Sequence, residues 1–218
     1  MAEYILQLSW MLPRIPADVS YDRASLACCV LGPSFSAFEK MGVDSVSTVL
    51  ITGISPVGFG AITSARFRGG RKSMANGTCT QQMGADTVVN PFEDGALEQL
   101  MDLTNGIGAD AALDCSGQVK AHRLCIDATR RGGKVAFIGQ CGEETPLRVS
   151  PDRIAKGLPL MRVWHYNLNL FLSLLKVTQK SPLLDLLVSH TLPMSKIQQA
   201  IEISASQQSA KIILHPWE

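Results

Sequence analysis

The segment Ser47–Gly60, with the sequence STVLITGISPVGFG, places the tightest constraint on how this chain can fold. Its β-branched run Thr48–Thr52 is typical of a buried strand, and the run ends abruptly at Gly53. Small residues that are compatible with a helix follow Gly58. The segment therefore predicts a strand, a tight turn and a helix in immediate succession.

The turn of this unit is a weakened form of a phosphate-binding pattern. Dinucleotide-binding proteins use a G-x-G-x-x-G turn to bring a pyrophosphate against backbone N–H groups at a helix N-terminus. Here the turn reads Gly53-Ile54-Ser55-Pro56-Val57-Gly58, with a serine in place of the middle glycine. A positive φ at that serine would cost about 1 kcal/mol. Phosphate contact by Gly53, Ser55, Pro56, Val57 and Gly58 remains one interpretation, and a plain strand–helix turn with glycines kept for packing is the other.

The composition excludes several classes of protein. The chain has 218 residues, of which 46% are hydrophobic and 18% charged, which suits one folded core with a smaller appendage. A net charge of +1 gives no reason to expect a nucleic-acid or membrane-surface partner. The N-terminus lacks a basic signal-peptide region, and the apolar run near Leu168–Leu175 is too short to span a membrane. We therefore expect a cytoplasmic protein.

Six cysteines, at positions 28, 29, 79, 115, 125 and 141, include no C-x-x-C pair. Their spacing predicts neither a disulfide framework nor a self-contained zinc knuckle.

Strand-like and helix-like segments alternate along most of the chain. We expect a helix that begins beyond Ser20, a break at Gly32-Pro33 and a second helix at 34–41. The strands expected after them are 48–52, 87–90, 109–115, 134–138, 160–164 and 211–215. The further expected helices are 94–103, 118–130, 169–179 and 195–204. This alternation predicts an α/β fold with a doubly wound parallel sheet.

One segment breaks the pattern. Residues 71–83, RKSMANGTCTQQM, show no strand-like apolar run and little helical periodicity. We expect this segment to be irregular and the second strand of the sheet to be lost.

Seven short motifs occur in one consistent order along the chain. They are Ala2-Glu3-Tyr4, Leu26-Ala27-Cys28-Cys29, the Gly53–Gly58 turn with its Pro-Val pair, Gly84-Ala85-Asp86, Asp114-Cys115-Ser116-Gly117, Gly132-Gly133-Lys134-Val135 and Ser189-His190-Thr191-Leu192-Pro193. In these motifs the chain resembles the medium-chain dehydrogenase/reductases, in their zinc-dependent alcohol and polyol dehydrogenase branch. The resemblance implies a Rossmann-type cofactor domain over residues 30–165. Residues 1–29 and 166–218 would be the remnant of a GroES-like catalytic domain that is truncated at its N-terminal side.

The same resemblance implies an oxidoreductase that transfers hydride between a secondary alcohol or polyol and NAD or NADP, and a possible homodimer. Cys115, Ser116, Gly117 and Gly139 would line the nicotinamide-ribose side of the cofactor site. A non-catalytic nucleotide-binding or dimerising domain is the alternative. A methyltransferase is a third reading, which the Pro-Val pair and the stretch His190–Pro193 disfavour.

Two departures from the family pattern bear on the ligands. Cys29 matches the family's third catalytic zinc ligand, but its partner ligands are absent, so zinc is not expected and a buried helix thiol is the simpler reading. Between Asp44 and Asp86 there is no Asp or Glu to bind the adenosine ribose. Arg71 could hold the 2′-phosphate of NADP instead, or a shortened segment has lost the adenosine pocket.

Four other side chains allow two interpretations each. Asp114 could support the cofactor edge through hydrogen bonds or could cap the next helix. A proton relay through His165 is possible, but a packed histidine is the simpler reading. His122 and His190 are interpreted as structural, and no catalytic residue can be named.

Overall fold

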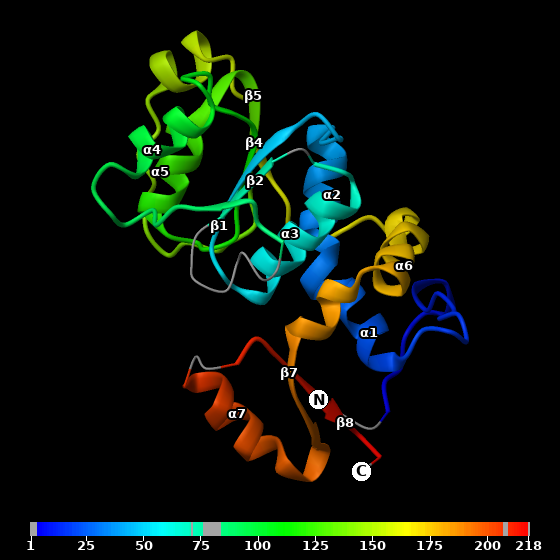
Figure 1. The fold of residues 1–218 in the computed structure, drawn as a ribbon. Coiled ribbons are helices and arrows are strands. Elements are labelled where there is room, and N and C mark those ends of the chain that lie inside the picture. Colours follow the sequence, from blue (N-terminus) through cyan, green and yellow to red (C-terminus); the bar gives the residue numbers. More distant parts are fainter. Residues whose placement is uncertain (1–3, 71, 76–83, 207–208, 218) are drawn as a thin grey trace.

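A six-stranded parallel sheet organises the computed structural model, which describes residues 4–70, 72–75, 84–206 and 209–217 (Figure 1). Its strands are β1 (Thr48–Thr52), β2 (Lys72–Ala75), β3 (Thr87–Val88), β4 (Ala109–Asp114), β5 (Thr129–Phe137) and β6 (Leu160–Arg162). They lie in the order β3-β2-β1-β4-β5-β6, and every neighbouring pair is parallel. The predicted α/β fold with a parallel sheet is confirmed.

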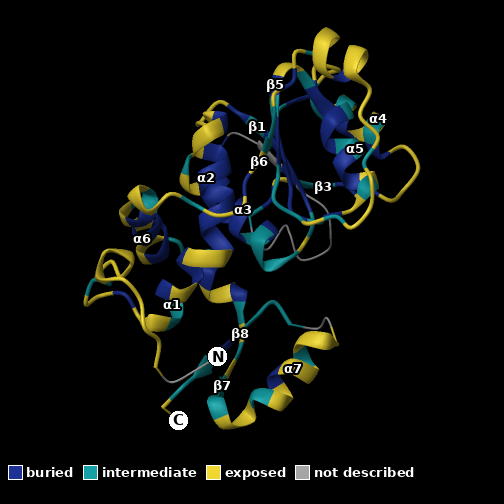
Figure 2. Ribbon diagram, turned by 180° about the vertical axis from the view of Figure 1, so that it is seen from behind, coloured by how far each residue is buried: buried dark blue, intermediate teal, exposed yellow. Residues whose placement is uncertain are grey.

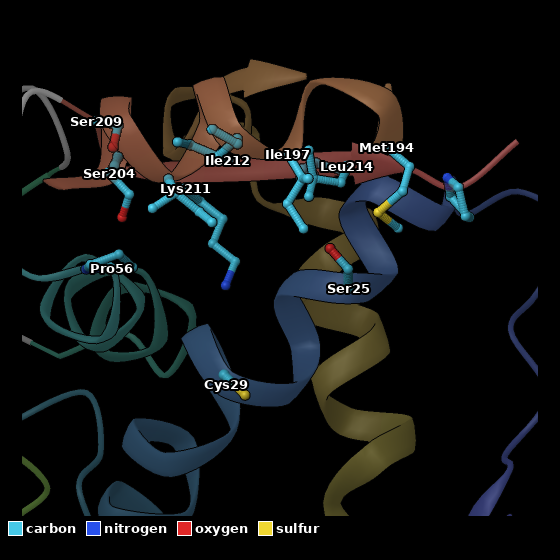
Figure 3. A pocket seen from close by; sticks show the side chains of 15 residues that line it. Ser25, Cys29, Pro56, Met194, Ile197, Ser204, Ser209, Lys211, Ile212 and Leu214 are labelled. Atoms are coloured by element: carbon cyan, nitrogen blue, oxygen red, sulfur yellow. The ribbon is translucent and has the colours of Figure 1, made fainter. Parts of the chain in front are cut away.

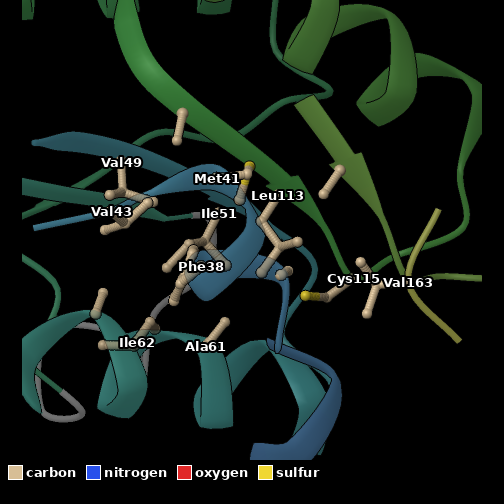
Figure 4. Packing of buried hydrophobic residues seen from close by; sticks show 14 of the residues in the cluster. Phe38, Met41, Val43, Val49, Ile51, Ala61, Ile62, Leu113, Cys115 and Val163 are labelled. Atoms are coloured by element: carbon tan, nitrogen blue, oxygen red, sulfur yellow. The ribbon is translucent and has the colours of Figure 1, made fainter. Parts of the chain in front are cut away.

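Helices cover both faces of the sheet because the strands are apolar on both sides. On one face Val49 and Ile51 of β1 pack against α2 (Gly32–Met41) and α3 (Pro56–Phe67), as Figure 4 shows. On the other face Leu50 packs in the cluster formed with α4 (Ala96–Leu103) and α5 (Val119–Ala128). The buried helix faces turn toward the sheet in Figure 2.

The central strand β1 pairs with β2 on one side and with β4 on the other. The order in which strands are added changes side at β1: β2 and β3 lie on one side of it, and β4, β5 and β6 lie on the other. Open α/β sheets bind ligands at the carboxyl ends of the strands next to such a switch point. The residues that follow β1 and β4 are therefore placed together at this edge.

The prediction that the second strand is lost is wrong. Strand β2 forms at Lys72–Ala75 and pairs with β1 from Thr48↔Lys72 to Ile51↔Ala75. Its Met74 is fully buried beside Leu50. Four residues are too few to show a periodicity, so this strand has no clear signal in the sequence. Residues 71 and 76–83 of the same predicted irregular segment lie outside the described residues.

The expected break at Gly32-Pro33 is also absent. Helix α1 (Tyr21–Leu26) continues through a π-helical turn, Ala27–Leu31, into α2. Pro33 lies just beyond the π-helical turn, whose altered hydrogen-bond pattern lets the helical segment accommodate a proline without a break. Gly32 lies so close to Tyr166 that a Cβ would fall 2.2 Å from its ring. Helix α1 begins after Ser20, as predicted, and Ser20 is its N-cap, because its Oγ accepts the N–H of Arg23 at 3.3 Å.

Helix α5 ends at Ala128, before the predicted end at Arg130. The ammonium group of Lys156 donates to the carbonyl oxygens of Ile126, Asp127 and Thr129 at 3.0, 2.6 and 3.0 Å. These bonds satisfy the last carbonyls of the helix, so the chain enters β5 directly.

The elements that follow Asn167 form a smaller C-terminal part. They are the short helical turns Leu168–Leu170, Pro182–Leu187 and Met194–Lys196, with α6 (Phe171–Lys180), β7 (Val188–Pro193), α7 (Ile197–Ala205) and β8 (Lys211–His215). Two further helical turns lie earlier in the chain, at Ser9–Met11 and, between β5 and β6, at Val149–Ala155. Strands β7 and β8 pair in parallel as a sheet of their own. The expected domain bounds, 30–165 against 1–29 with 166–218, stay a prediction.

A buried carboxylate ties α5 to the segment that leads into β6. Asp152, 2% exposed, accepts two hydrogen bonds from the guanidinium of Arg123 at 2.7 and 2.9 Å and one from the backbone N–H of Arg148 at 2.8 Å. The bonds from Arg123 hold the pKa of Asp152 well below its ordinary value of 3.8. The charged carboxylate therefore contributes stability above that pH.

The Asp152→Asn variant is expected to lower the free energy of unfolding at pH 7 by about 2 kcal/mol, because it leaves Arg123 without its buried partner. Since the contribution is lost as pH falls through the depressed folded-state pKa, the difference from wild type should shrink below about pH 4. Urea unfolding at pH 7, 5 and 3 measures both effects. Asp185→Asn is the control, because its side chain is 65% exposed and its ion pair with Arg23 is 3.7 Å long. Equal losses in the two variants would contradict the prediction.

Candidate functional site

The turn after β1 is closed by two glycines that contact backbone. Gly53 has a φ of +93°, and a Cβ at this position would lie 2.6 Å from the backbone nitrogen of Ser116. A Cβ on Gly58 would lie 1.9 Å from the carbonyl oxygen of Gly53. Both glycines are therefore required for strand, turn and helix to meet.

Ser55, at the position of the missing glycine, is the N-cap of α3. Its φ of −78° and ψ of 167° are extended, so the cost expected for a positive φ does not arise. Its Oγ accepts the N–H of Gly58 at 3.3 Å and donates to the carbonyl oxygen of Cys115 at 3.3 Å. Serine thus satisfies one of the free N–H groups at the helix start and links the turn to the end of β4.

Asp114, the last residue of β4, connects the neighbouring edge residues. Its buried carboxylate accepts from Thr52 Oγ1 at 2.7 Å, Ser116 Oγ at 2.6 Å, Ser116 N at 3.1 Å and Gly117 N at 3.0 Å, and it lies 3.1 Å from His122 Nε2. The interpretation of Asp114 as a helix cap is wrong, because the N-cap of α5 is Gln118 and no side chain caps this helix. Asp114 instead holds the turn before α5 and fixes the ends of β1 and β4 relative to each other.

His122 has a structural environment, as expected. Its Nδ1 lies 2.7 Å from Thr145 Oγ1, and its ring meets Phe137 edge-on at a centroid distance of 4.8 Å.

The predicted residues Gly117 and Gly139 pack against each other at the same edge. A Cβ on Gly139 would lie 2.2 Å from Gly117 N, and a Cβ on Gly117 would lie 2.1 Å from the carbonyl oxygen of Gln140. Cys115 offers only its backbone here, because its side chain is buried in the core and burial raises the pKa of the thiol. The structure brings Gly53, Ser55, Pro56, Val57, Gly58, Cys115, Ser116, Gly117 and Gly139 to one edge of the sheet.

A pocket of about 700 Å³ opens beside the N-terminus of α3 (Figure 3). Pro56, Ser25 and Cys29 line one side, and residues of α7 and β8 line the other. The side chain of Lys211 extends from β8 toward the space between Pro56 and Cys29. Lys211 was not predicted as a site residue, since a lysine at the start of a predicted strand carries no signal of a site.

Cys29 is exposed in this pocket, so its interpretation as a buried thiol is wrong. It faces outward because it lies on the π-helical turn, whose buried residues are Ala27, Val30 and Leu31. Within the described ranges, no three His, Cys, Asp or Glu side chains come together in a way that could hold a metal ion. The described residues around Cys29 therefore do not fit a zinc site.

The remaining candidates lie away from this edge or outside the described residues. His165 is exposed on another pocket, and half-buried His190 contacts Ser189. Arg71 lies outside the described residues, as does the segment that follows β2. The interpretation of Arg71 as a contact for the 2′-phosphate of NADP therefore stays a prediction from the sequence.

The sequence pattern of the zinc-binding dehydrogenases matches residues 56–180, more than half of the chain. This chain belongs to the zinc-binding dehydrogenase family. Relatives include an L-threonine 3-dehydrogenase from Symbiobacterium thermophilum, 31% identical over 78% of this chain, and one from Coxiella burnetii, 29% identical over all of it. An alcohol dehydrogenase from Thermotoga maritima, 25% identical, superposes over 94% of this chain with a TM-score of 0.86.

This member of the family spans only part of its relatives. It covers 51% and 64% of the two threonine dehydrogenases and 60% of the Thermotoga maritima chain. In the part of the chain that the structure describes, no helix has the length and apolar character needed to cross a membrane.

Replacing Asp114 by Asn should lower the free energy of unfolding by about 3 kcal/mol, because an amide nitrogen would then face buried donors. Ser116→Ala, which removes one of the donors, should cost only about 1 kcal/mol. Urea unfolding of both variants measures the difference. Similar small losses in the two would show that Asp114 does not organise this edge.

Proposed function

We propose that this chain is the cofactor-binding part of a zinc-type alcohol dehydrogenase-like oxidoreductase and that it binds NAD or NADP across the carboxyl ends of β1 and β4. The observation that carries the proposal is the turn Gly53–Gly58, which opens α3 at the switch point of a parallel sheet. Family membership supports the same ligand class.

The residues at this edge fit a pyrophosphate. The N-terminus of α3 favours an anion, since its first N–H groups point out of the helix. Lys211 brings a positive charge from the opposite wall of the pocket, and none of the described residues that line the pocket is acidic. Both features favour a negatively charged group beside Pro56.

Each part of the edge has its own role in the proposed complex. Ser55 orients the start of α3, and its hydroxyl proton could turn from the Cys115 carbonyl oxygen to a phosphate oxygen. Asp114 holds the backbone of Ser116 and Gly117, which would line the nicotinamide-ribose side together with Gly139. When bound, the nicotinamide supplies the hydride acceptor or donor, and a small alcohol or polyol is the proposed substrate.

Zinc has no role in this proposal, since the described residues around Cys29 do not form a ligand set. A nucleotide-binding or dimerising domain without catalysis is the alternative. Arg71 remains the proposed contact for a 2′-phosphate. A cytoplasmic location and a homodimer also stay predictions.

Titration with NADH and with NADPH, followed by nicotinamide fluorescence, should show saturable binding with a Kd in the micromolar range. Ser55→Asp keeps an N-cap acceptor but adds a negative charge beside the pyrophosphate, so affinity should fall at least about tenfold while stability is kept. Ser20→Asp is the matched control, because it makes the same change at the N-cap of α1. Absence of binding by either cofactor up to about 1 mM would refute the proposal.

Lys211→Gln should weaken NADH binding about threefold to tenfold, with a smaller effect at high salt, because it removes a charge beside the α3 N-terminus. Lys196→Gln is the control, since Lys196 lies in the same C-terminal part but does not line the pocket. If the two variants bind NADH equally well, Lys211 does not contact the cofactor.

A further inference from the structure

A second pocket, of about 350 Å³, lies between α2 and the segment that follows β6. It is lined by Ser36, Lys40, Arg162, Trp164, His165, Tyr166 and Asn167. Every one of these side chains can donate a hydrogen bond, and three of them, Lys40, Arg162 and Trp164, can only donate. None of the described residues that line the pocket carries a carboxylate.

The two cations of this pocket have no partner in the described part of the chain. Neither Lys40 nor Arg162 forms an ion pair or a side-chain hydrogen bond with any residue that the structure describes. Glu39 is adjacent to Lys40 in sequence but pairs with Arg68 instead. The lining therefore carries a charge of +2 with His165 neutral.

The pocket also has a buried polar residue. Ser36 is 3% exposed, lines the pocket and makes no side-chain hydrogen bond with another described residue. It lies one helical turn before Lys40, so both side chains are on the same face of α2. Because its hydroxyl has no partner among the described residues, Ser36 can donate to a ligand in the pocket.

The framework of the pocket is well defined. Arg162 ends β6 in register with Phe137, and the next residue, Val163, donates its N–H to the Phe137 carbonyl oxygen at 3.0 Å. Tyr166 is fixed by close contact with Gly32 and by Cys28, whose Sγ lies 3.6 Å from the tyrosine hydroxyl. The backbone that carries Arg162 is thus fixed by a strand end, and the ring of Tyr166 is fixed by a helix contact.

We propose that this pocket binds the phosphate group of a small molecule, either inorganic phosphate or a phosphate monoester. A phosphate dianion balances the charges of Lys40 and Arg162, and its oxygens can accept from the guanidinium fork, the ammonium and the Ser36 hydroxyl. The volume suits a phosphate with a small organic group, and Trp164, 64% exposed, offers a ring face to such a group. The site shares no residue with the pocket beside Pro56.

Isothermal titration calorimetry with inorganic phosphate and with phenyl phosphate tests the site. The full chain should carry Ser55→Asp, so that the N-terminus of α3 does not compete for the anion. Saturable binding of one phosphate per chain is expected, with a Kd of about 1 mM or below. Tighter binding of phenyl phosphate would identify a monoester as the ligand, whereas equal affinities would identify the phosphate group alone.

Added to this background, Lys40→Gln and Arg162→Gln should each weaken binding at least about fivefold. Arg153→Gln is the matched control, because Arg153 is exposed but does not line the pocket. Circular dichroism establishes that the variants are folded. As a measurement independent of these variants, phosphate should shift the fluorescence of Trp164 saturably in a chain carrying Trp10→Phe and Trp217→Phe.

Two results would overturn the proposal. One is the absence of saturable binding of both probes up to about 20 mM, and the other is binding that survives the combined loss of Lys40 and Arg162. Because NADH titration reports on the other pocket, failure of this proposal and failure of the proposed cofactor site can be told apart.

Discussion

The carboxylate of Asp114 is the interaction on which the candidate cofactor edge depends. It binds the last side chain of β1 and the turn after β4, and it contacts His122 on α5. A single buried acceptor therefore fixes two central strands and a covering helix relative to one another. Asp114 fixes the positions of the backbone N–H groups of Ser116 and Gly117. The edge is therefore preorganised by a side chain that need not touch a ligand.

One continuous helical segment serves both pockets. Its first part, α1 and the π-helical turn, supplies Ser25 and Cys29 to the pocket beside Pro56, whereas α2 supplies Ser36 and Lys40 to the pocket beside Arg162. The segment also packs against α3 and α6 through buried apolar residues. The C-terminal part and the sheet are thus joined by a rigid element rather than by a loop alone.

Much of the fold could be predicted from the sequence, because long apolar strands and terminal glycines have strong local signals. The strand at 48–52 and the one at 211–215 fall where they were predicted. Strand β2 could not be found, since its four residues present too little pattern and its place in the sheet is set by pairing with β1. The break predicted at Gly32-Pro33 is absent because the glycine allows close packing against Tyr166 and does not end the helix.

The candidate site was less predictable than the fold. The turn and the strand ends could be inferred from order along the chain, but Lys211 reaches Pro56 only through the packing of a distant strand. The outward position of Cys29 likewise depends on a π-helical turn that has no recognised sequence signature. Ser55 showed that an unusual residue need not bring strain, because its extended backbone and its hydroxyl fit the N-cap role.

The interlocking glycines bear on how distant members of this family can be recognised. At Gly53, Gly58, Gly117 and Gly139 a Cβ would strike backbone atoms at 1.9 to 2.6 Å, so substitution there is blocked by the architecture itself. The middle position of the turn has no such barrier, as Ser55 demonstrates. A search that demands three glycines in the turn would overlook chains like this one. A sequence profile that requires Gly53 and Gly58 together with Gly117 and Gly139 would find such chains. These four glycines are required by backbone packing, whether or not the middle residue of the turn is a glycine.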